Sequence, residues 1–401
     1  MNPDRFLIYT TVLTIMGLSN AVIPILPELA AQDHSSFGAF ASSLLFSAYF
    51  LGALATMLPF GILSDRFGNL RFIGLGILLT AGSGLIILLS ENLWVLLLAR
   101  FVEGSACGAF FPAAFSTLSE YRNLGRYMGE FTFLLNAGLA AGTLFSGLLA
   151  ETHLKGAIFI FTFMSFLLIL LILPRNRELK SPGQAGKKTT ENRSVVNSTT
   201  GNRNTEKRNT GNRNTGNRPD SFSDPFKSAF GTLTAVFRGR NSRILLLSML
   251  LNGGVGILIA YYPDYSANFL TKAQLGSSIA SLYICAMITS LLIGRFSIGE
   301  RTMIRIGIAF SALGAFLAIQ YPFPGFSCLG GGSGIAIVGF SLAFARMDID
   351  RGLAMGLFNT TIYAGLSLAP ITAGLFTGVL SLEEIFLANG CILTGAFFLK
   401  E

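Results

Sequence analysis

Apolar residues occur in long runs along the chain, separated by short polar or charged segments. The first run, Phe6 to Leu26, contains no Asp, Glu, Lys or Arg. A helix of about 20 such residues crosses the hydrocarbon core of a bilayer, so each run is predicted to be a membrane-spanning helix. We predict twelve of them, at 5–29, 38–62, 71–90, 94–118, 127–149, 156–173, 243–263, 277–298, 302–320, 325–345, 352–379 and 384–399.

The twelve predicted helices fall into two groups of six, divided by a long polar segment. Within this segment, the stretch from Asn202 to Arg218 repeats Asn, Arg, Thr and Gly. A composition with so few apolar residues cannot bury a core. We therefore predict an N-terminal six-helix bundle at 1–173, a cytoplasmic low-complexity linker at 174–242 and a C-terminal six-helix bundle at 243–401.

Composition and charge agree with a membrane protein. Hydrophobic residues make up 51% of the chain and charged residues 12%, against roughly 25% charged residues in soluble domains. With the N-terminus inside, 26 of the 29 Lys and Arg residues fall on the cytoplasmic side, Lys155 and Lys272 fall outside, and Arg100 lies within the membrane. Because cytoplasmic loops retain basic residues, we expect a multi-pass protein of the cell membrane with both termini in the cytoplasm. The net charge of +8 then reflects topology and no nucleic-acid partner is expected.

The positions of several residues exclude whole classes of chemistry. Both histidines, His34 and His153, lie in predicted outside loops, so no histidine relay, zinc site or Ser-His-Asp triad is expected in the membrane. The segment 183–189 has the wrong spacing for a phosphate-binding loop and does not follow a strand. We therefore predict no enzyme activity, catalytic residue, cofactor or metal, and an ion gradient rather than ATP as the source of energy.

The two groups of helices contain a weak internal repeat. At a constant offset of 227 residues, the fifth helix aligns with the eleventh. Such a repeat indicates two structurally related six-helix units. The matched positions are Met128, Gly129, Gly138, Thr143 and Gly147 in the first half and Met355, Gly356, Gly365, Pro370 and Gly374 in the second.

The loop between the second and third helices has the specific pattern G-I-L-S-D-R-F-G-N-L-R, from Gly61 to Arg71. Gly61 and Gly68 allow tight backbone turns, and Asp65 lies next to the start of a helix, where a carboxylate is favourable. Arg66 follows at the cytoplasmic surface. The pattern resembles the loop motif of the major facilitator superfamily, G-x-L-x-D-R-x-G-R-K, with Asn and Leu in place of the usual basic pair.

This resemblance implies an all-α membrane protein with the major facilitator fold, in which twelve transmembrane helices form two six-helix pseudo-symmetric bundles around a cavity. It also implies a conformational latch, a group of residues that holds the cytoplasmic face closed. In related transporters an acid at the cytoplasmic end of helix 4 joins this group, and Glu120 is placed for that role. The predicted latch consists of Gly61, Asp65, Arg66, Gly68, Arg71 and Glu120.

The fourth helix contains two ionisable residues, Arg100 and Glu103, within its apolar span. They are three residues apart and share one helix face, and such groups are costly inside a membrane unless they face a cavity or a partner. The segment resembles a second motif of the superfamily, an Arg followed by Gln-Gly that is associated with proton handling, with Glu103 in place of Gln. Two interpretations have equal weight: Arg100 tunes proton binding by Glu103, or the pair neutralises itself and fixes helix packing.

The fifth helix has small residues at intervals of about four, a spacing that lets helices approach closely. The spacing also resembles the motif of the family's drug:proton antiporters, with Thr143 and Ser146 at two altered positions. Glu130, near the cytoplasmic end of the same helix, is a second candidate for proton coupling. The matching positions are Gly129, Gly138, Gly142 and Gly147.

Six further residues are polar or amphipathic and lie in predicted helices 1, 5, 7, 8 and 11, which line the cavity in related transporters. Each is expected either to contact substrate or to form an interhelical hydrogen bond, and the second role is the commoner one for a single residue. They are Asn20, Asn136, Asn252, Tyr283, Asn359 and Tyr363.

Together these patterns predict a secondary active transporter that works by alternating access. They favour proton-coupled efflux of hydrophobic or amphipathic small molecules by a monomer in the lipid bilayer, with protons as the coupling ion. One alternative is an importer or uniporter of a sugar, organic anion or metabolite, because two positions of the antiporter motif are altered. A second alternative is a membrane sensor or assembly partner that does not transport.

Overall fold

The computed structural model describes residues 3–31, 38–119, 121, 124–178, 242–296, 298–347 and 351–399, which form helices joined by short turns. Apart from its two ends, the predicted linker lies outside these residues. With α1, η1 and α2 taken as one segment, the described residues form twelve helical segments. The elements are α1 (Pro3–Ala21), η1 (Ile23–Ile25), α2 (Leu26–Ala31), α3 (Gly38–Phe67), α4 (Asn69–Leu89), α5 (Leu93–Ser119), α6 (Leu124–Ala150), α7 (Gly156–Glu178), α10 (Ser242–Ser266), α11 (Lys272–Ile293), α12 (Glu300–Gln320), α13 (Pro322–Ala345), α14 (Arg351–Gly374) and α15 (Leu382–Phe398).

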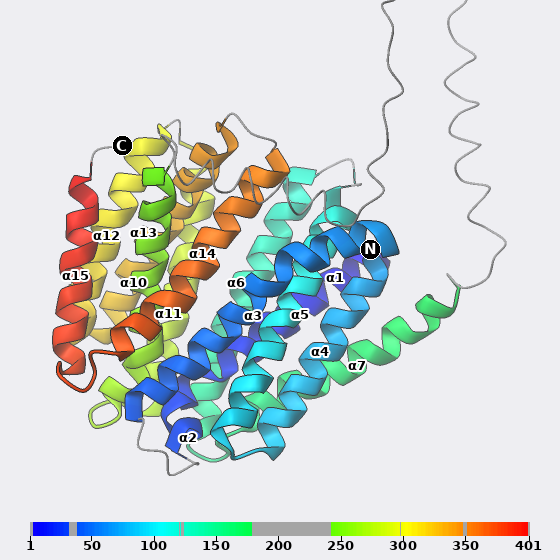
Figure 1. The fold of residues 1–401 in the computed structure, drawn as a ribbon, viewed down its shortest axis with the longest axis horizontal. Coiled ribbons are helices and arrows are strands. Elements are labelled where there is room, and N and C mark those ends of the chain that lie inside the picture. The colour runs from blue at the N-terminus through cyan, green and yellow to red at the C-terminus, as the bar shows by residue number, and fades with distance from the viewer. Residues whose placement is uncertain are drawn as a thin grey trace, which may run out of the picture.

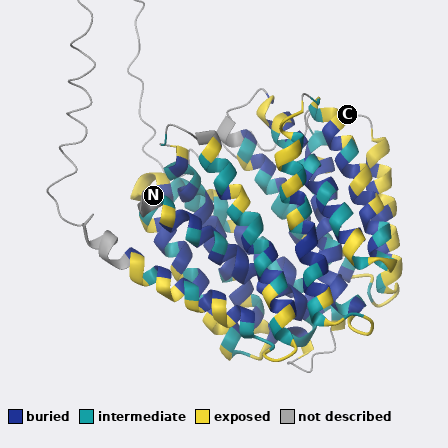
Figure 2. Cartoon of the chain, turned by 180° about the vertical axis from the view of Figure 1, so that it is seen from behind, coloured by how far each residue is buried: buried dark blue, intermediate teal, exposed yellow. Residues whose placement is uncertain are grey.

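The bundle has the surface of a membrane protein. In the described part of the chain, nine segments are long and apolar enough to cross a membrane, and the apolar part of α7, Gly156–Ile172, is shorter. α14 and α15 pack into the same bundle, mainly against α10 and α12 respectively. Figure 2 shows exposed residues along the outer helices, and on α7 these include Phe159, Phe163 and Leu170. Soluble proteins seldom expose continuous apolar surface of this kind, so the predicted all-α transmembrane fold is confirmed.

The first seven helices and the last six form two halves that lie side by side (Figure 1). Contacts of α6 with α11 and of α3 with α14 join the halves. Both chain ends lie toward the same side of the bundle (Figure 1), which we call the termini face. The other side is called the opposite face.

Several predicted helix boundaries are wrong by about one turn. The second and sixth helices, predicted to end at 62 and 173, end at Phe67 and Glu178. The eighth helix, predicted at 277–298, is α11 at Lys272–Ile293. It begins early because a capping box forms at its start. The Thr271 side chain accepts from the backbone N–H of Gln274, and the Gln274 side chain accepts from the backbone N–H of Thr271, so both donors are satisfied. The eleventh helix, α14, likewise ends five residues before its predicted end.

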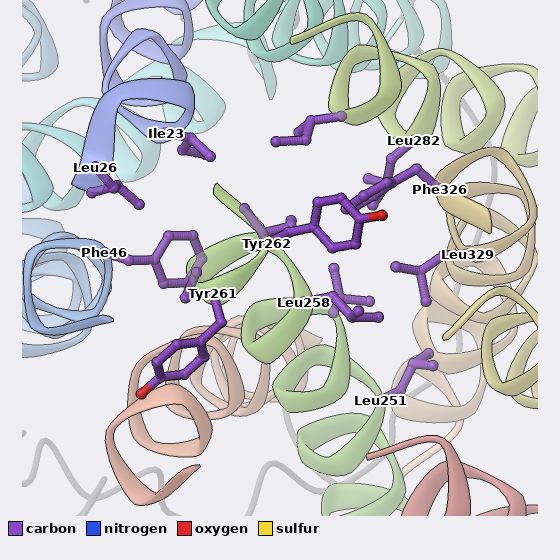
Figure 3. Packing of buried hydrophobic residues seen from close by; sticks show 14 of the residues in the cluster. Ile23, Leu26, Phe46, Leu251, Leu258, Tyr261, Tyr262, Leu282, Phe326 and Leu329 are labelled. Atoms are coloured by element: carbon purple, nitrogen blue, oxygen red, sulfur yellow. The ribbon is translucent and has the colours of Figure 1, made fainter. Parts of the chain in front are cut away.

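An apolar cluster joins the two halves near the opposite face. Tyr261 and Tyr262 lie side by side toward the end of α10, with Phe46 of α3 next to the first and Phe326 of α13 next to the second (Figure 3). The rings of Tyr262 and Phe326 meet edge to face at 4.8 Å. The Tyr261 hydroxyl donates to the Pro370 carbonyl oxygen at 2.8 Å. These contacts hold α10 within the second half and pack it against α3 of the first half.

The two halves repeat the same contacts between their helices. Gly142 of α6 fits against α1 beside Asn20, and Gly365 of α14 fits against α10 beside Asn252. Gly142 lies against the carbonyl oxygen of Gly17 and the amide nitrogen of Ala21, which are three residues before and one residue after Asn20. Gly365 lies against the same two atoms of Met249 and Gly253, at the same distances in sequence from Asn252. Gly142 is therefore the equivalent of Gly365, at an offset of 223. The predicted offset of 227, which paired Gly138 with Gly365, is wrong by about one helical turn because it matched residue types rather than contacts.

A second pair of contacts gives the same result for other helices. Gly104 of α5 packs against the Tyr49 carbonyl oxygen on α3, and Gly330 of α13 packs against that of Leu282 on α11. The glycine four residues later, Gly108 on α5 and Gly334 on α13, meets a threonine hydroxyl in both halves. Tyr49 therefore corresponds to Leu282, and α5 corresponds to α13 at an offset of 226.

Candidate functional site

A cavity of about 610 Å³ lies between the two halves. Its walls come from α1, α3, α5 and α6 on one side and from α10, α11, α13 and α14 on the other. All six residues proposed from the sequence for a cavity lie in its wall, and their contact with a substrate stays a prediction. These residues are Asn20, Asn136, Asn252, Tyr283, Asn359 and Tyr363.

The cavity extends toward the termini face and is closed at the opposite face. On α6 the lining begins at Met128, four residues after the helix starts, and on α11 it continues to Leu291, two residues before the helix ends. Toward the opposite face, Gly147 of α6 packs directly against Gly276 of α11. A Cβ atom added to Gly276 would lie 2.9 Å from the Gly147 Cα.

An ion pair also joins the two halves at the opposite face. Lys272 Nζ, at the start of α11, lies 2.6 Å from Glu28 Oε1 of α2 and donates to the Pro24 carbonyl oxygen at 2.9 Å. The two side chains are 21% and 34% exposed, so solvent screens the pair less than a fully exposed one. The distribution of basic residues predicts Lys272 outside, but this contact could not be predicted because no local pattern in the sequence links Lys272 to Glu28.

The described residues that line the cavity carry no formal charge. Among the described residues that line it there is no Asp, Glu, Lys, Arg or His. Its four asparagines occupy equivalent positions in the two halves. Asn20 corresponds to Asn252, and the offset between α6 and α14 makes Asn136 correspond to Asn359. Because burying an unpaired charge is costly, this cavity suits a neutral or amphipathic ligand that hydrogen-bonds to both halves.

The Arg100–Glu103 pair is buried beside the cavity and does not form part of its wall. Arg100 Nη1 lies 2.6 Å from Glu103 Oε2, and the two side chains are 3% and 0% exposed. Arg100 Nε donates to the Leu45 carbonyl oxygen at 3.3 Å. The guanidinium carbon lies 4.8 Å from the centre of the Tyr49 ring. Tyr49, which the sequence analysis missed, does line the cavity.

Two observations favour a functional role for this pair over a packing role. Glu103 Oε1 is buried and has no hydrogen-bond partner among the described residues, and such an unsatisfied buried atom is costly and uncommon in a group that serves packing alone. By the offset between α5 and α13, the equivalents of Arg100 and Glu103 are Phe326 and Leu329, both fully buried. The same helix interface therefore packs without charge, as buried ion pairs replaced by apolar residues often do.

Glu130, the second candidate for proton coupling, lies near the termini face on α6. It accepts from Arg126 Nε at 2.8 Å and from the Tyr9 hydroxyl at 2.8 Å, and its side chain is 36% exposed. It does not line the cavity. Glu130 thus belongs to a partly exposed surface ion pair with Arg126, and Glu103 is the stronger candidate for proton coupling.

The loop of the predicted latch lies at the termini face. Gly68 separates α3 from α4 with a φ of +100°, a conformation that side chains disfavour. Asp65, Arg66 and Arg71 are exposed, and Asp65 forms no ion pair with another described residue. Glu120 lies outside the described residues, so the assembly of the latch stays a prediction.

Three of the four motif glycines on α6 lie at close helix contacts. A Cβ atom on Gly138 would lie 2.7 Å from the Leu13 carbonyl oxygen, Gly142 packs against α1, and Gly147 packs against α11. Gly129 has open space around it and lines the cavity. Close packing accounts for the first three, and a role of the motif in antiport stays a prediction.

Comparisons with known proteins agree with this architecture. Residues 7–348 match the Major Facilitator Superfamily. A class H tetracycline resistance protein of Pasteurella multocida is 28% identical over 197 residues, which cover 47% of this chain and 48% of that protein. An uncharacterized MFS-type transporter of Methanocaldococcus jannaschii is 25% identical over 403 residues, covering 96% of this chain and 94% of the relative.

A solved structure extends the likeness of fold to the whole chain. A mutant form of the nucleoside transporter NupG superposes with a TM-score of 0.67 over 98% of both chains, at 15% sequence identity. At this identity the likeness concerns the fold alone. Because the family match covers most of the sequence and the fold agrees, the predicted family is confirmed: this chain belongs to the Major Facilitator Superfamily and is a multi-pass membrane transporter rather than an enzyme.

Proposed function

We propose that this transporter exports uncharged or amphipathic small molecules in exchange for protons. The observation that carries the proposal is a buried Arg100–Glu103 pair next to a cavity whose described lining residues are all uncharged. The cavity suits a ligand that brings no charge, and the pair supplies a protonatable group that the ligand does not occupy. The partial relative from Pasteurella multocida is a tetracycline resistance protein, and export of a drug-like molecule is in keeping with that name.

Exchange requires two conformations, each open to one face. In the conformation described here, the cavity extends toward the termini face, which the distribution of Lys and Arg predicts to be cytoplasmic. The Gly147–Gly276 contact and the Lys272–Glu28 pair close the opposite face. We propose that residues 1–173 and 243–401 rock as two bodies, so that these contacts part when the ligand is released outside.

Protonation of Glu103 is the step that links this motion to the proton gradient. A proton on Glu103 neutralises the carboxylate and leaves Arg100 as an unbalanced buried cation. In a low-dielectric interior this is a large change in electrostatic energy. The two protonation states therefore favour different conformations, and an external proton bound at Glu103 drives the return of the empty transporter.

An importer or uniporter of a neutral metabolite is the second candidate. It is favoured by the carboxamides and phenols that line the cavity from both halves, since these groups also bind hydroxyl-rich solutes. Purified protein in liposomes with an imposed pH gradient separates the candidates. Substrate movement against the proton flow supports exchange, and indifference to the gradient supports uniport. Absence of flux for every substrate tried would support a sensor without transport activity.

The uncharged lining predicts a preference that a matched pair of fluorescent probes can measure. N-phenylnaphthylamine and anilinonaphthalene sulfonate share one ring system and differ by a sulfonate group. We expect the purified protein to bind the neutral probe at least about tenfold more tightly. A tenfold difference in affinity corresponds to ~1.4 kcal/mol, which is less than the usual cost of burying an unpaired charge. Fluorescence titration in detergent gives both affinities. Asn359→Arg should reverse the preference, and tighter binding of the sulfonate by the unaltered protein would contradict the proposal.

Charge reversal at Asp65 tests the latch. We propose that Asp65 pairs with its partners only when the termini face closes, and it is exposed here because the cavity extends to that face. The Asp65→Arg variant loses an ion pair that stabilises the closed termini face by about 1 kcal/mol. Its transport rate should therefore be about fivefold lower than that of the wild type. Initial rates of probe flux in liposomes measure this effect. Glu91→Arg, at an exposed residue of the opposite face, serves as the control. An unchanged rate in Asp65→Arg would refute the latch.

A further inference from the structure

We infer that Tyr49 is the positioning residue through which occupancy of the cavity reaches the Arg100–Glu103 pair. The inference rests on the proposed proton exchange and adds to it the path between ligand and proton site. Tyr49 is 4% exposed, lines the cavity, and also contacts Arg100. It therefore stands between the space for the ligand and the buried charges.

On the side of the charges, two contacts hold Tyr49 against α5, and a third holds its helix, α3, to Arg100. The Arg100 guanidinium lies over its ring at 4.8 Å. Its hydroxyl lies 2.9 Å from Cys107 Sγ, one turn of α5 beyond Glu103. Arg100 Nε also donates to the carbonyl oxygen of Leu45, one turn before Tyr49 on α3. A shift of this part of α3 must therefore move the guanidinium.

On the side of the cavity, Tyr49 is connected to the other half of the molecule by aromatic rings. It meets Phe50 edge to face at 4.9 Å, and Phe50 lies 6.1 Å from Tyr363 of α14. All three rings line the cavity. Because α3 and α14 belong to different halves, rocking of the halves or a ligand among these rings must act on Tyr49.

The groups around the pair leave Arg100 as the charge that governs Glu103. The titratable groups that face it are Cys107 of α5 and Tyr49 of α3, with Tyr363 of α14 behind Tyr49. Thiols and phenols are neutral at physiological pH. The position of the guanidinium is thus the variable through which the cavity can influence proton binding.

The other half supports this assignment by contrast. At the position equivalent to Tyr49 it has Leu282, which also lines the cavity. The equivalents of the charged pair in that half are apolar as well. The aromatic ring is therefore present in the half that has a guanidinium to hold, and a leucine fills the same place in the half that has none.

The physical effect of the ring gives the direction of coupling. A ligand seated against Tyr49 keeps the ring over the guanidinium, which in turn stays on the Glu103 carboxylate, and a nearby cation favours the ionised form. Conversely, a proton on Glu103 releases the guanidinium and weakens the support for the ligand. Linkage is reciprocal, so ligand affinity should fall as Glu103 takes up its proton.

The test measures how the affinity for N-phenylnaphthylamine depends on pH in detergent-solubilised full-length protein. We expect the affinity of the wild type to fall about tenfold from high to low pH. Tyr49→Phe, which keeps the ring, should retain this dependence, whereas Tyr49→Leu should bind at high pH with a dependence of less than about twofold. Tyr283→Leu removes a cavity phenol that does not touch the pair, and it should lower affinity while keeping the dependence on pH.

Each other result has a definite meaning. Wild-type pH dependence in Tyr49→Leu overturns the inference and leaves the proposed exchange standing. A wild type whose affinity does not depend on pH overturns the proposed coupling and this inference together. Tyr49→Met is the second variant if Tyr49→Leu does not fold. Loss of probe binding at every pH in both variants would assign Tyr49 to the ligand site alone, against the inference.

Discussion

Replacing Glu103 with glutamine is expected to abolish proton-driven uphill transport while probe binding persists at every pH with about the affinity that the wild type has at low pH, because glutamine is neutral like the protonated carboxyl group. Glutamine keeps the size of the side chain and can still accept from Arg100, but it cannot gain or lose a proton. The side chain is fully buried, so no water can replace the missing function. Flux of N-phenylnaphthylamine in liposomes under an imposed pH gradient, together with fluorescence titration, measures the two properties separately.

The controls for this experiment come from other carboxylates of the chain. Glu300 pairs with Arg346 at 2.5 Å on the exposed end of α12, and Glu300→Gln should transport like the wild type. If Glu130→Gln rather than Glu103→Gln abolished coupling, the proton site would lie on α6 instead of α5. Undiminished coupling in Glu103→Gln would remove this residue from the mechanism.

A companion variant separates coupling from packing. Arg100→Phe combined with Glu103→Leu installs the residues that occupy the equivalent places of the other half. Exchange of a whole buried ion pair for well-packed apolar residues is often neutral or stabilising, whereas removal of one partner costs about 3–5 kcal/mol. The double variant should therefore unfold near the wild-type temperature and still fail to couple. A protein that folds and remains coupled would restore the packing interpretation.

The second large effect is expected from Gly276→Val at the contact between α6 and α11. A Cβ atom at this position would lie 2.5 Å from the Thr143 carbonyl oxygen and 2.9 Å from the Gly147 Cα. Both are backbone atoms, so the helices must separate at the opposite face. Overpacking costs about 1–3 kcal/mol, and each ~1.4 kcal/mol changes a population tenfold. The population of the conformation with a closed opposite face should fall at least about tenfold, and the rate of transport should fall by a similar factor.

A distance measurement shows whether this loss has the proposed cause. Spin labels at positions 91 and 383, on exposed residues of the opposite face in different halves, should move apart in Gly276→Val. Gly82→Val on α4 is the matched control, because no atom lies within 4 Å of its added Cβ. Lost transport with an unchanged label distance would mean that this contact does not set the conformation.

Much of the fold and part of the site could be predicted from hydropathy and a few motifs. The twelve segments follow from runs of apolar residues, since lipid demands such runs. The six polar residues now found in the wall of the cavity were identified because they lie in the helices that line the cavity in related transporters. Arg100 and Glu103 stood out for the same reason, and their spacing on one helix predicted the contact between them.

What could not be predicted depends on contacts between distant segments. The equivalence of Gly142 with Gly365 follows from how each fits its neighbouring helix, which residue types alone do not reveal. Tyr49 has no charged neighbour in sequence, and its place under Arg100 depends on the rotation of α3 against α5. The pair of Lys272 with Glu28 forms only when the halves meet. In each case the informative quantity is the relative position of two helices.

The described residues of the cavity wall are all uncharged, and this has a consequence for the energetics of transport. If a neutral molecule leaves while one proton enters at Glu103, each cycle carries one positive charge into the cell. The exchange is then electrogenic, and a membrane voltage that is negative inside assists it by about 2.3 kcal/mol per 100 mV. Export would continue on voltage alone when the external medium is as alkaline as the cytoplasm.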